Sequence, residues 1–181
     1  MSYGFDAEDA PGVLAKLTGY ELWERTQRAG QQLATAYERT IGARSEQERV
    51  AVALEFLRRM RQLLALRLVA VAGDRRQAFP QRVPPAGGHG VAALWAEVFW
   101  AARARSPEDD SGVLEATDAS IRGLLALDPS DLADPDSLRA WWERLQLVEE
   151  TFGGLEMEAQ ATVERLRVAV DDERQVRPET S

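Results

Sequence analysis

Apolar residues recur every three or four positions along most of this sequence, which is the spacing that places side chains on one face of an α-helix. The first long segment of this kind covers residues 20–41, where Trp23, Leu33 and Tyr37 share a face. Gly42 follows directly and is a typical helix stop. We therefore expect a long first helix that buries this face.

A second helix is predicted to begin at Ser45. Ser45 and Glu48 form a capping box, in which each side chain accepts a hydrogen bond from a backbone N–H group near the other residue. An apolar stripe runs from Val50 to Val71, and past Gln62 apolar residues surround the helix. A helix that is apolar on most sides is typical of the centre of a bundle, although the same pattern suits a patch that meets a partner.

The clearest predicted loop covers residues 73–90. It begins at Gly73 and Asp74, where we expect the second helix to end, and it contains three prolines and several glycines. We expect a hinge or a functional loop here rather than a domain boundary, because the sequence after it returns to the same helical pattern. The whole chain, residues 1–181, is predicted to be one helical domain with a loose N-terminal tail over residues 1–9.

Further helix starts are marked by a serine or aspartate followed by proline, because the first residue caps the helix and proline suits its first turn. After a predicted helix over residues 91–105, these dipeptides occur at 106–107, 128–129 and 134–135. The first predicts a helix that ends near Leu127. A single helical turn is expected between the second and the third.

The last helix, which begins near residue 135, has the most regular pattern in the chain. Its seam alternates steps of three and four residues over more than four heptads, as in a coiled coil. The seam residues are Leu138, Trp141, Leu145, Val148, Phe152, Leu155, Ala159, Thr162, Leu166 and Ala169. Such a helix is about 50 Å long. Gly153 and Gly154 fall on its outer face, and the charged tail over residues 171–181 is expected to fray.

The periodicity contains no strand pattern, since runs of β-branched residues with a period of two are missing. The sequence therefore predicts an all-α fold. We expect a mostly antiparallel bundle of about five main helices, which ends in one long heptad-patterned helix. That helix is expected either to project beyond the bundle or to pair with a second copy.

The composition is that of an ordinary globular protein, with 45% apolar and 29% charged residues among 181 and a formal net charge of −8. No cysteine is present, which excludes disulfides and thiolate chemistry. The first residues are acidic and lack an apolar run, so no secretory signal is expected, and no segment reaches the roughly 20 apolar residues of a membrane span. We therefore expect a cytoplasmic protein without a membrane partner.

Charge is uneven along the chain. Between residues 44 and 82 nine arginines oppose four acids, whereas between residues 108 and 136 nine acids oppose one arginine. The interpretation we prefer is that these segments face each other in the fold or are solvated. The alternative is two surfaces for two partners.

Candidate chemistry is sparse. His89 is the single histidine and lies in the glycine-rich part of the 73–90 loop, where we expect an exposed side chain. The pattern Glu-x-x-His, zinc motifs and phosphate-binding glycine loops are all missing. The aspartates at 128, 131, 134 and 136 are best explained as helix caps. We predict no catalytic residue, no metal ligand and no cofactor, and we favour a protein that is not an enzyme.

The tryptophans are the best markers of a contact surface. Trp23, Trp95 and Trp141 lie on apolar stripes and are expected in the core, whereas Trp100 and Trp142 lie beside the stripes. Tryptophan is enriched at interface hot spots. The predicted interaction residues are therefore Trp100 and Trp142, together with the seam residues Leu145, Phe152 and Leu155.

The preferred function is a protein–protein interaction module, such as an adaptor, a chaperone-like protein or an assembly subunit, which acts through the helical seam on a partner or on itself. A first alternative is a bundle that binds an anionic small molecule, for which we expect a cavity lined by at least two buried arginines. A second is a nucleic-acid-associated subunit that uses the arginine-rich second helix, although the net acidity does not favour nucleic acid as a partner.

Overall fold

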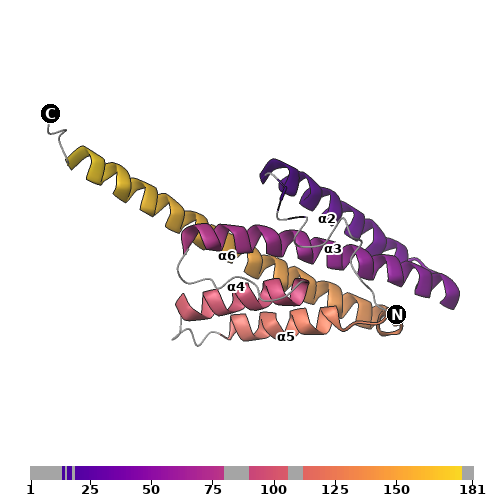
Figure 1. Cartoon of the computed structure of the whole chain (residues 1–181). Coiled ribbons are helices and arrows are strands. Elements are labelled where there is room, and N and C mark those ends of the chain that lie inside the picture. Colours follow the sequence, from indigo (N-terminus) through magenta and orange to yellow (C-terminus); the bar gives the residue numbers. More distant parts are fainter. Residues whose placement is uncertain (1–13, 15, 18, 80–89, 106–111, 177–181) are drawn as a thin grey trace.

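A computed structural model describes residues 14, 16–17, 19–79, 90–105 and 112–176. These residues form five α-helices, with one short 3₁₀ helix between the last two (Figure 1). The bounds are α2 (Gly19–Ile41), α3 (Glu46–Ala78), α4 (Val91–Arg105), α5 (Val113–Leu125), η2 (Pro129–Leu132) and α6 (Pro135–Val176). The predicted all-α bundle with a long C-terminal helix is confirmed.

The centre of the bundle is α3, which contacts α2, α4, α6 and η2. Buried side chains lie on all sides of its second half, from Leu63 to Ala72, so the apolar surround predicted past Gln62 faces other helices. The capping box predicted its start correctly, since the Glu48 backbone N–H donates to the Ser45 hydroxyl at 3.1 Å. α3 therefore supplies a large part of the hydrophobic core.

α2 and α3 form an antiparallel hairpin. Gln32 lies beside Arg59, while Thr40, further along α2, lies beside Val52, which comes earlier in α3. The Thr40 hydroxyl donates to the Val52 carbonyl oxygen at 3.5 Å. α5 is likewise antiparallel to α6, since Thr117 lies beside Thr151 and Gly123 beside Trp141.

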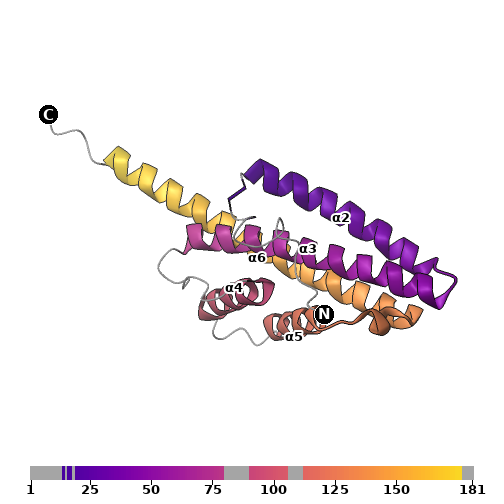
Figure 2. The ribbon, with the colours of Figure 1, turned by 45° about the vertical axis from the view of Figure 1, so that its right-hand side comes forward.

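α3 and α6 instead run parallel, because contacts between them advance together along both helices. Phe56 packs near Trp142, with ring centroids 6.1 Å apart, and Arg75 pairs with Glu158 at 3.2 Å. α4 has the same direction as both, so the C-terminal ends of α3 and α4 lie together on one side of the bundle (Figures 1 and 2).

The predicted face of α2 is correct at Leu33, which is buried, and at Tyr37, which packs against the core, but wrong at Trp23, which is 58% exposed. The buried residues of α2 are Ala29, Leu33, Ala36 and Thr40. Trp23 contacts Tyr20 instead, with ring centroids 6.2 Å apart.

One predicted boundary needs correction. α3 continues past Gly73 to Ala78, so the first residues of the predicted 73–90 loop are helical. The extra turn buries Ala78 and places Arg75 3.2 Å from Glu158 of α6. Within the described residues α5 begins at Val113, directly after Gly112, whose positive φ of 69° interrupts a helix.

Two other boundaries were predicted correctly. The helical turn between the two Asp-Pro dipeptides is η2, and α6 begins at Pro135. The prediction that the chain frays from residue 171 is wrong as far as Val176, because α6 is helical up to that residue. The N-terminal tail over 1–9, the remainder of the loop at 80–89 and the serine-proline start at 106–107 lie outside the described residues.

Candidate interaction surfaces

The last part of α6 leaves the bundle. Ala159 is its last buried residue, and the helix continues from there to Val176, with no other helix beside it in either view (Figures 1 and 2). This free segment, residues 160–176, is about 25 Å long. We call it the α6 tail.

The place where α6 leaves the bundle is determined by the ends of α3 and α4. At this level Glu158 pairs with both Arg75 of α3 and Arg105 of α4. Both guanidinium groups also lie over the ring of Phe79, at 5.4 and 4.6 Å from its centroid. Arginines near helix C-termini are stabilised by the negative end of the helix dipole. Beyond this cluster neither α3 nor α4 continues to cover α6.

The α6 tail carries an apolar stripe that continues the buried seam. Val163 is half-buried, Leu166 is 51% exposed and Val170 is also exposed. These three residues follow Ala159 in steps of four, three and four, so they lie on the helix face that packs inside the bundle. The predicted seam used Thr162, Leu166 and Ala169. Val163 and Val170 lie beside this predicted seam. A step of four residues from Ala159, instead of three, leads to Val163, Leu166 and Val170.

The charged residues of the α6 tail lie mainly away from this stripe. At about 100° per residue, Arg165 and Asp172 lie on the outer side of the helix, away from the stripe. Arg167 lies nearer the stripe and pairs with Glu164 at 2.8 Å.

A groove between α5 and α6 forms a second surface, with a volume of about 780 Å³. Leu114 and Val148 are buried in its lining, while the rim includes the exposed Leu147. Thr117 and Thr151 also line it, and their hydroxyls hydrogen-bond to each other at 3.0 Å. The two polar atoms thus satisfy one another, and the groove is mainly apolar.

The structure separates the five predicted interaction residues. Leu145 and Phe152 are fully buried among the helices, and Trp142 stacks on Tyr37 with ring centroids 4.2 Å apart. Leu155 is buried but lines the α5–α6 groove. These four side chains hold α6 to the bundle.

Trp100 lies apart from them on α4 and is 64% exposed. It contacts Phe99 edge-on, with ring centroids 5.6 Å apart. Of the predicted set, it is the residue whose side chain is open to a partner.

Three arginines of α3, Arg67, Arg75 and Arg76, pair with acids on other helices. Arg67 lies 3.4 Å from Glu149 and 3.6 Å from Glu156, both on α6, and Arg76 binds Glu97 of α4 through two hydrogen bonds of 2.5 and 2.7 Å. In these pairs the basic segment faces acids of α6 and α4. It also meets the acidic segment at 108–136, since α3 contacts η2 and Arg61 donates to the Leu125 carbonyl oxygen at 3.5 Å.

Burial dominates the electrostatics of the Arg67 cluster. It raises the pKa of Glu149 and of Glu156 above the ordinary value, and the charge of Arg67 offsets only part of the rise. Burial also raises the pKa of Asp74, whose negative charge adds to the rise at Glu156. These carboxylates are costly to ionise, which is typical of a packed interface between helices.

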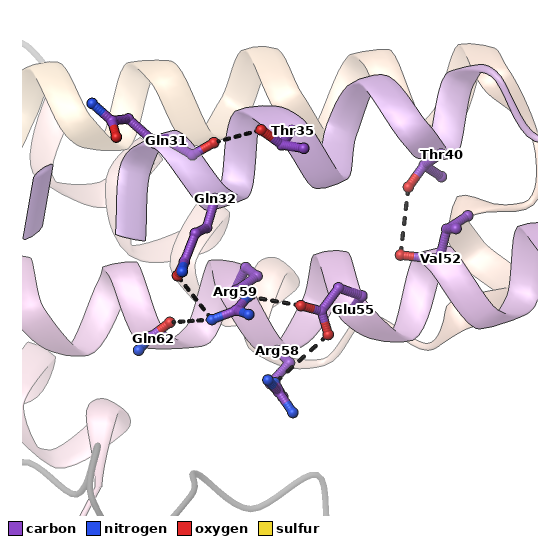
Figure 3. Close-up of polar contacts among 9 residues, drawn as sticks. All are labelled: Gln31, Gln32, Thr35, Thr40, Val52, Glu55, Arg58, Arg59 and Gln62. Carbon is purple, nitrogen blue, oxygen red and sulfur yellow. Dashed lines mark hydrogen bonds and ion pairs between the residues drawn. The ribbon is translucent and has the colours of Figure 1, made fainter. Parts of the chain in front are cut away.

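A smaller arginine-lined groove of about 470 Å³ lies between α2 and α3. In its lining, Arg59 donates to Glu55 at 2.7 Å and to Gln32 at 2.8 Å (Figure 3). Arg28, also in its lining, is exposed and pairs with Glu24. Neither of these two grooves is lined by two buried arginines, which is what the anionic-ligand alternative requires.

Neither a metal site nor a membrane span is found in the part of the chain that the structure describes. No group of three or more histidine, aspartate or glutamate side chains is placed there to hold a metal ion. No described helix is both long and apolar enough to cross a membrane.

The fold and its surfaces define the chain as an all-α helical bundle with a projecting C-terminal helix. Comparison of the chain with protein-family models, with curated proteins and with solved structures gave no match.

Proposed function

We propose that this protein is a protein–protein interaction module and that the α6 tail is its docking element. The observation that supports this proposal is the continuation of the core seam beyond the bundle. Val163, Leu166 and Val170 extend the face that carries Phe152 and Ala159; Val163 is half-buried, whereas Leu166 and Val170 are exposed. Apolar residues at this spacing suit a second helix packed along the stripe.

The energetics favour a docking role over a merely solvated helix. An isolated helix of this length is marginal in water, because its first turn is costly to form. The α6 tail does not need a new first turn, because it extends a helix that is already held in the bundle. It therefore presents an ordered apolar stripe, and a partner that covers the stripe removes apolar surface from water without first having to order the helix.

The proposal is tested by placing a photo-crosslinking amino acid at Leu166 of the full chain, in the cells that make the protein. Glu164, on the opposite side of the helix and exposed, is the matched control position. We expect a protein adduct from position 166, a much weaker one from 164, and loss of the 166 adduct when Val170→Glu is added. No protein adduct, or equal yields at the two positions, contradicts a docking role for this stripe.

A further inference from the structure

We propose that this protein binds a linear polyamine in a pocket between α2, α3 and α6, with one ammonium group of the ligand against Glu149. The pocket has a volume of about 440 Å³. Its α2 side includes Gln27, Gly30 and Gln31, and Arg67 of α3 and Glu149 of α6 form its charged side. The site is separate from the α6 tail and does not depend on the docking role proposed above.

Gly30 leaves room for a ligand on the α2 side. A Cβ atom added at this residue would meet no other atom within 4 Å. Ala34, one turn further along, also lines the pocket and has a small, exposed side chain. The amide groups of Gln27 and Gln31 offer carbonyl oxygens that accept hydrogen bonds from an ammonium group. The α2 side therefore combines open space with neutral acceptors.

Two charged groups of the pocket lining are incompletely bonded. Glu149 Oε1 and Arg67 Nε are both shielded from water, and neither has a hydrogen-bond partner among the residues that the structure describes. The ion pair between the two side chains joins Arg67 Nε to the other carboxylate oxygen, Oε2, at 3.4 Å. A buried carboxylate oxygen without a donor is costly. An N–H group of a ligand at Oε1 would remove that cost.

Negative charge exceeds positive charge around this pocket. The ion pairs of Glu149 and Glu156 within the described residues are both made with Arg67, and Asp74 is near enough to raise the pKa of Glu156. Burial raises the pKa of all three carboxyl groups, and Arg67 offsets only part of the rise at the two glutamates. A cationic ligand supplies the compensation that one guanidinium group does not complete.

The carboxylates are spread along the helices rather than gathered at one point. Glu149 and Glu156 share a face of α6 and are seven residues apart, which separates them by about 10 Å along the helix. No group of three acids in the described ranges is placed to hold a metal ion. This spread suits a chain of ammonium groups, with one in the pocket at Glu149 and the next directed toward Glu156.

An aromatic pair lies on the same face of α2 as the pocket. Ala34, Gly30, Gln27 and Trp23 follow one another in steps of four, three and four residues, so Trp23 shares the face that lines the pocket. Its indole is 58% exposed and lies beside Tyr20, with ring centroids 6.2 Å apart. The face of an indole attracts ammonium groups. Packing in the core does not account for this tryptophan, whereas contact with a bound cation does.

Isothermal titration calorimetry of spermidine into the full chain at low salt tests the site. We expect saturable binding that Glu149→Gln weakens at least about tenfold, because it removes a charged acceptor. The matched control is Glu150→Gln, which removes the same charge from an exposed position that lines the α5–α6 groove instead. This control should change the affinity by less than about twofold. Trp23→Leu should weaken binding by about two- to fivefold.

A second variant, Gly30→Leu, fills the pocket without changing the charge. It should abolish spermidine binding, while the thermal midpoint stays unchanged or rises, because leucine favours a helix more than glycine does. Retained binding in Gly30→Leu overturns the inference, as does a native chain that shows no saturable binding. Equal weakening by Glu149→Gln and Glu150→Gln also overturns it, since that result indicates general attraction of polyamines to a chain with a net charge of −8.

Discussion

Gly123 on α5 faces the indole of Trp141 on α6, and a methyl group at this position tests how closely the two helices pack. A Cβ atom at residue 123 would lie 2.5 Å from Cη2 and 2.9 Å from Cζ3 of Trp141. Carbon atoms in contact are normally about 3.5–4.0 Å apart. The Gly123→Ala substitution therefore requires the indole or the helix to move by about 1 Å.

Two effects set the size of the change in the free energy of unfolding. Replacing glycine by alanine inside a helix stabilises it by about 0.5–1 kcal/mol. Overpacking a filled site costs about 1–3 kcal/mol. We expect Gly123→Ala to range from neutral to destabilising by about 2 kcal/mol. At Gly153 of α6 no atom lies within 4 Å of a new Cβ, so Gly153→Ala should stabilise by the full helix term.

Chemical denaturation of the two variants measures this difference directly, and thermal midpoints should follow at about 2–4 °C per kcal/mol. A double-mutant cycle with Trp141→Phe isolates the clash, because phenylalanine lacks the outer indole ring. In that background Gly123→Ala should become stabilising. If Gly123→Ala stabilises the native sequence as much as Gly153→Ala does, the close approach of α5 and α6 is wrong.

Three further predictions concern the core, the buried acids and the tail. Phe152→Ala should lower the free energy of unfolding by about 3–5 kcal/mol in urea denaturation, since the ring is fully buried, and a loss below 1 kcal/mol would contradict that burial. Burial raises the pKa of Glu149 and of Glu156 above 4.5, so the folded state holds protons that the unfolded chain has released. The free energy of unfolding should therefore fall as the pH rises from 4.5 through the folded-state pKa values of these two glutamates. In a Glu149→Gln/Glu156→Gln variant, urea denaturation should show a free energy of unfolding that changes less with pH than that of the native chain. Truncation after residue 161 should leave the thermal midpoint nearly unchanged, because no residue of α6 between Ala159 and Val176 is fully buried, and a large drop would show that the tail supports the bundle.

The helices themselves were predictable because their signals are local. The serine–glutamate capping box, the Asp-Pro dipeptides and the alternation of three and four residues depend only on neighbours within a turn or two. They located the start of α3, η2 and α6 correctly. The extra turn of α3 past Gly73 was missed, because its cause is not local: Arg75 is 1% exposed and pairs with Glu158, which is 83 residues away.

The candidate site illustrates the same limit. The sequence defined the heptad seam as one continuous stripe, and the interaction residues proposed on it, Leu145, Phe152 and Leu155, are all buried in the bundle. Only the tertiary structure divides it, because α3 and α4 end level with Glu158 and leave the rest of α6 uncovered. The exposure of a tryptophan likewise depends on which helix lies beside it. Trp23 was expected in the core and is exposed, whereas Trp142 was expected at a contact surface and stacks on Tyr37.

The sequence by itself determined that this protein is helical, where most of its helices begin and which residues form the seam, since backbone hydrogen bonding and periodicity operate over a few residues. The tertiary structure decided the rest. It made α3 and α6 parallel, enclosed the arginines of α3 against the acids of α6 and α4, and left the final turns of the seam exposed. Those outcomes depend on where the separate helices end relative to one another, which no local pattern encodes.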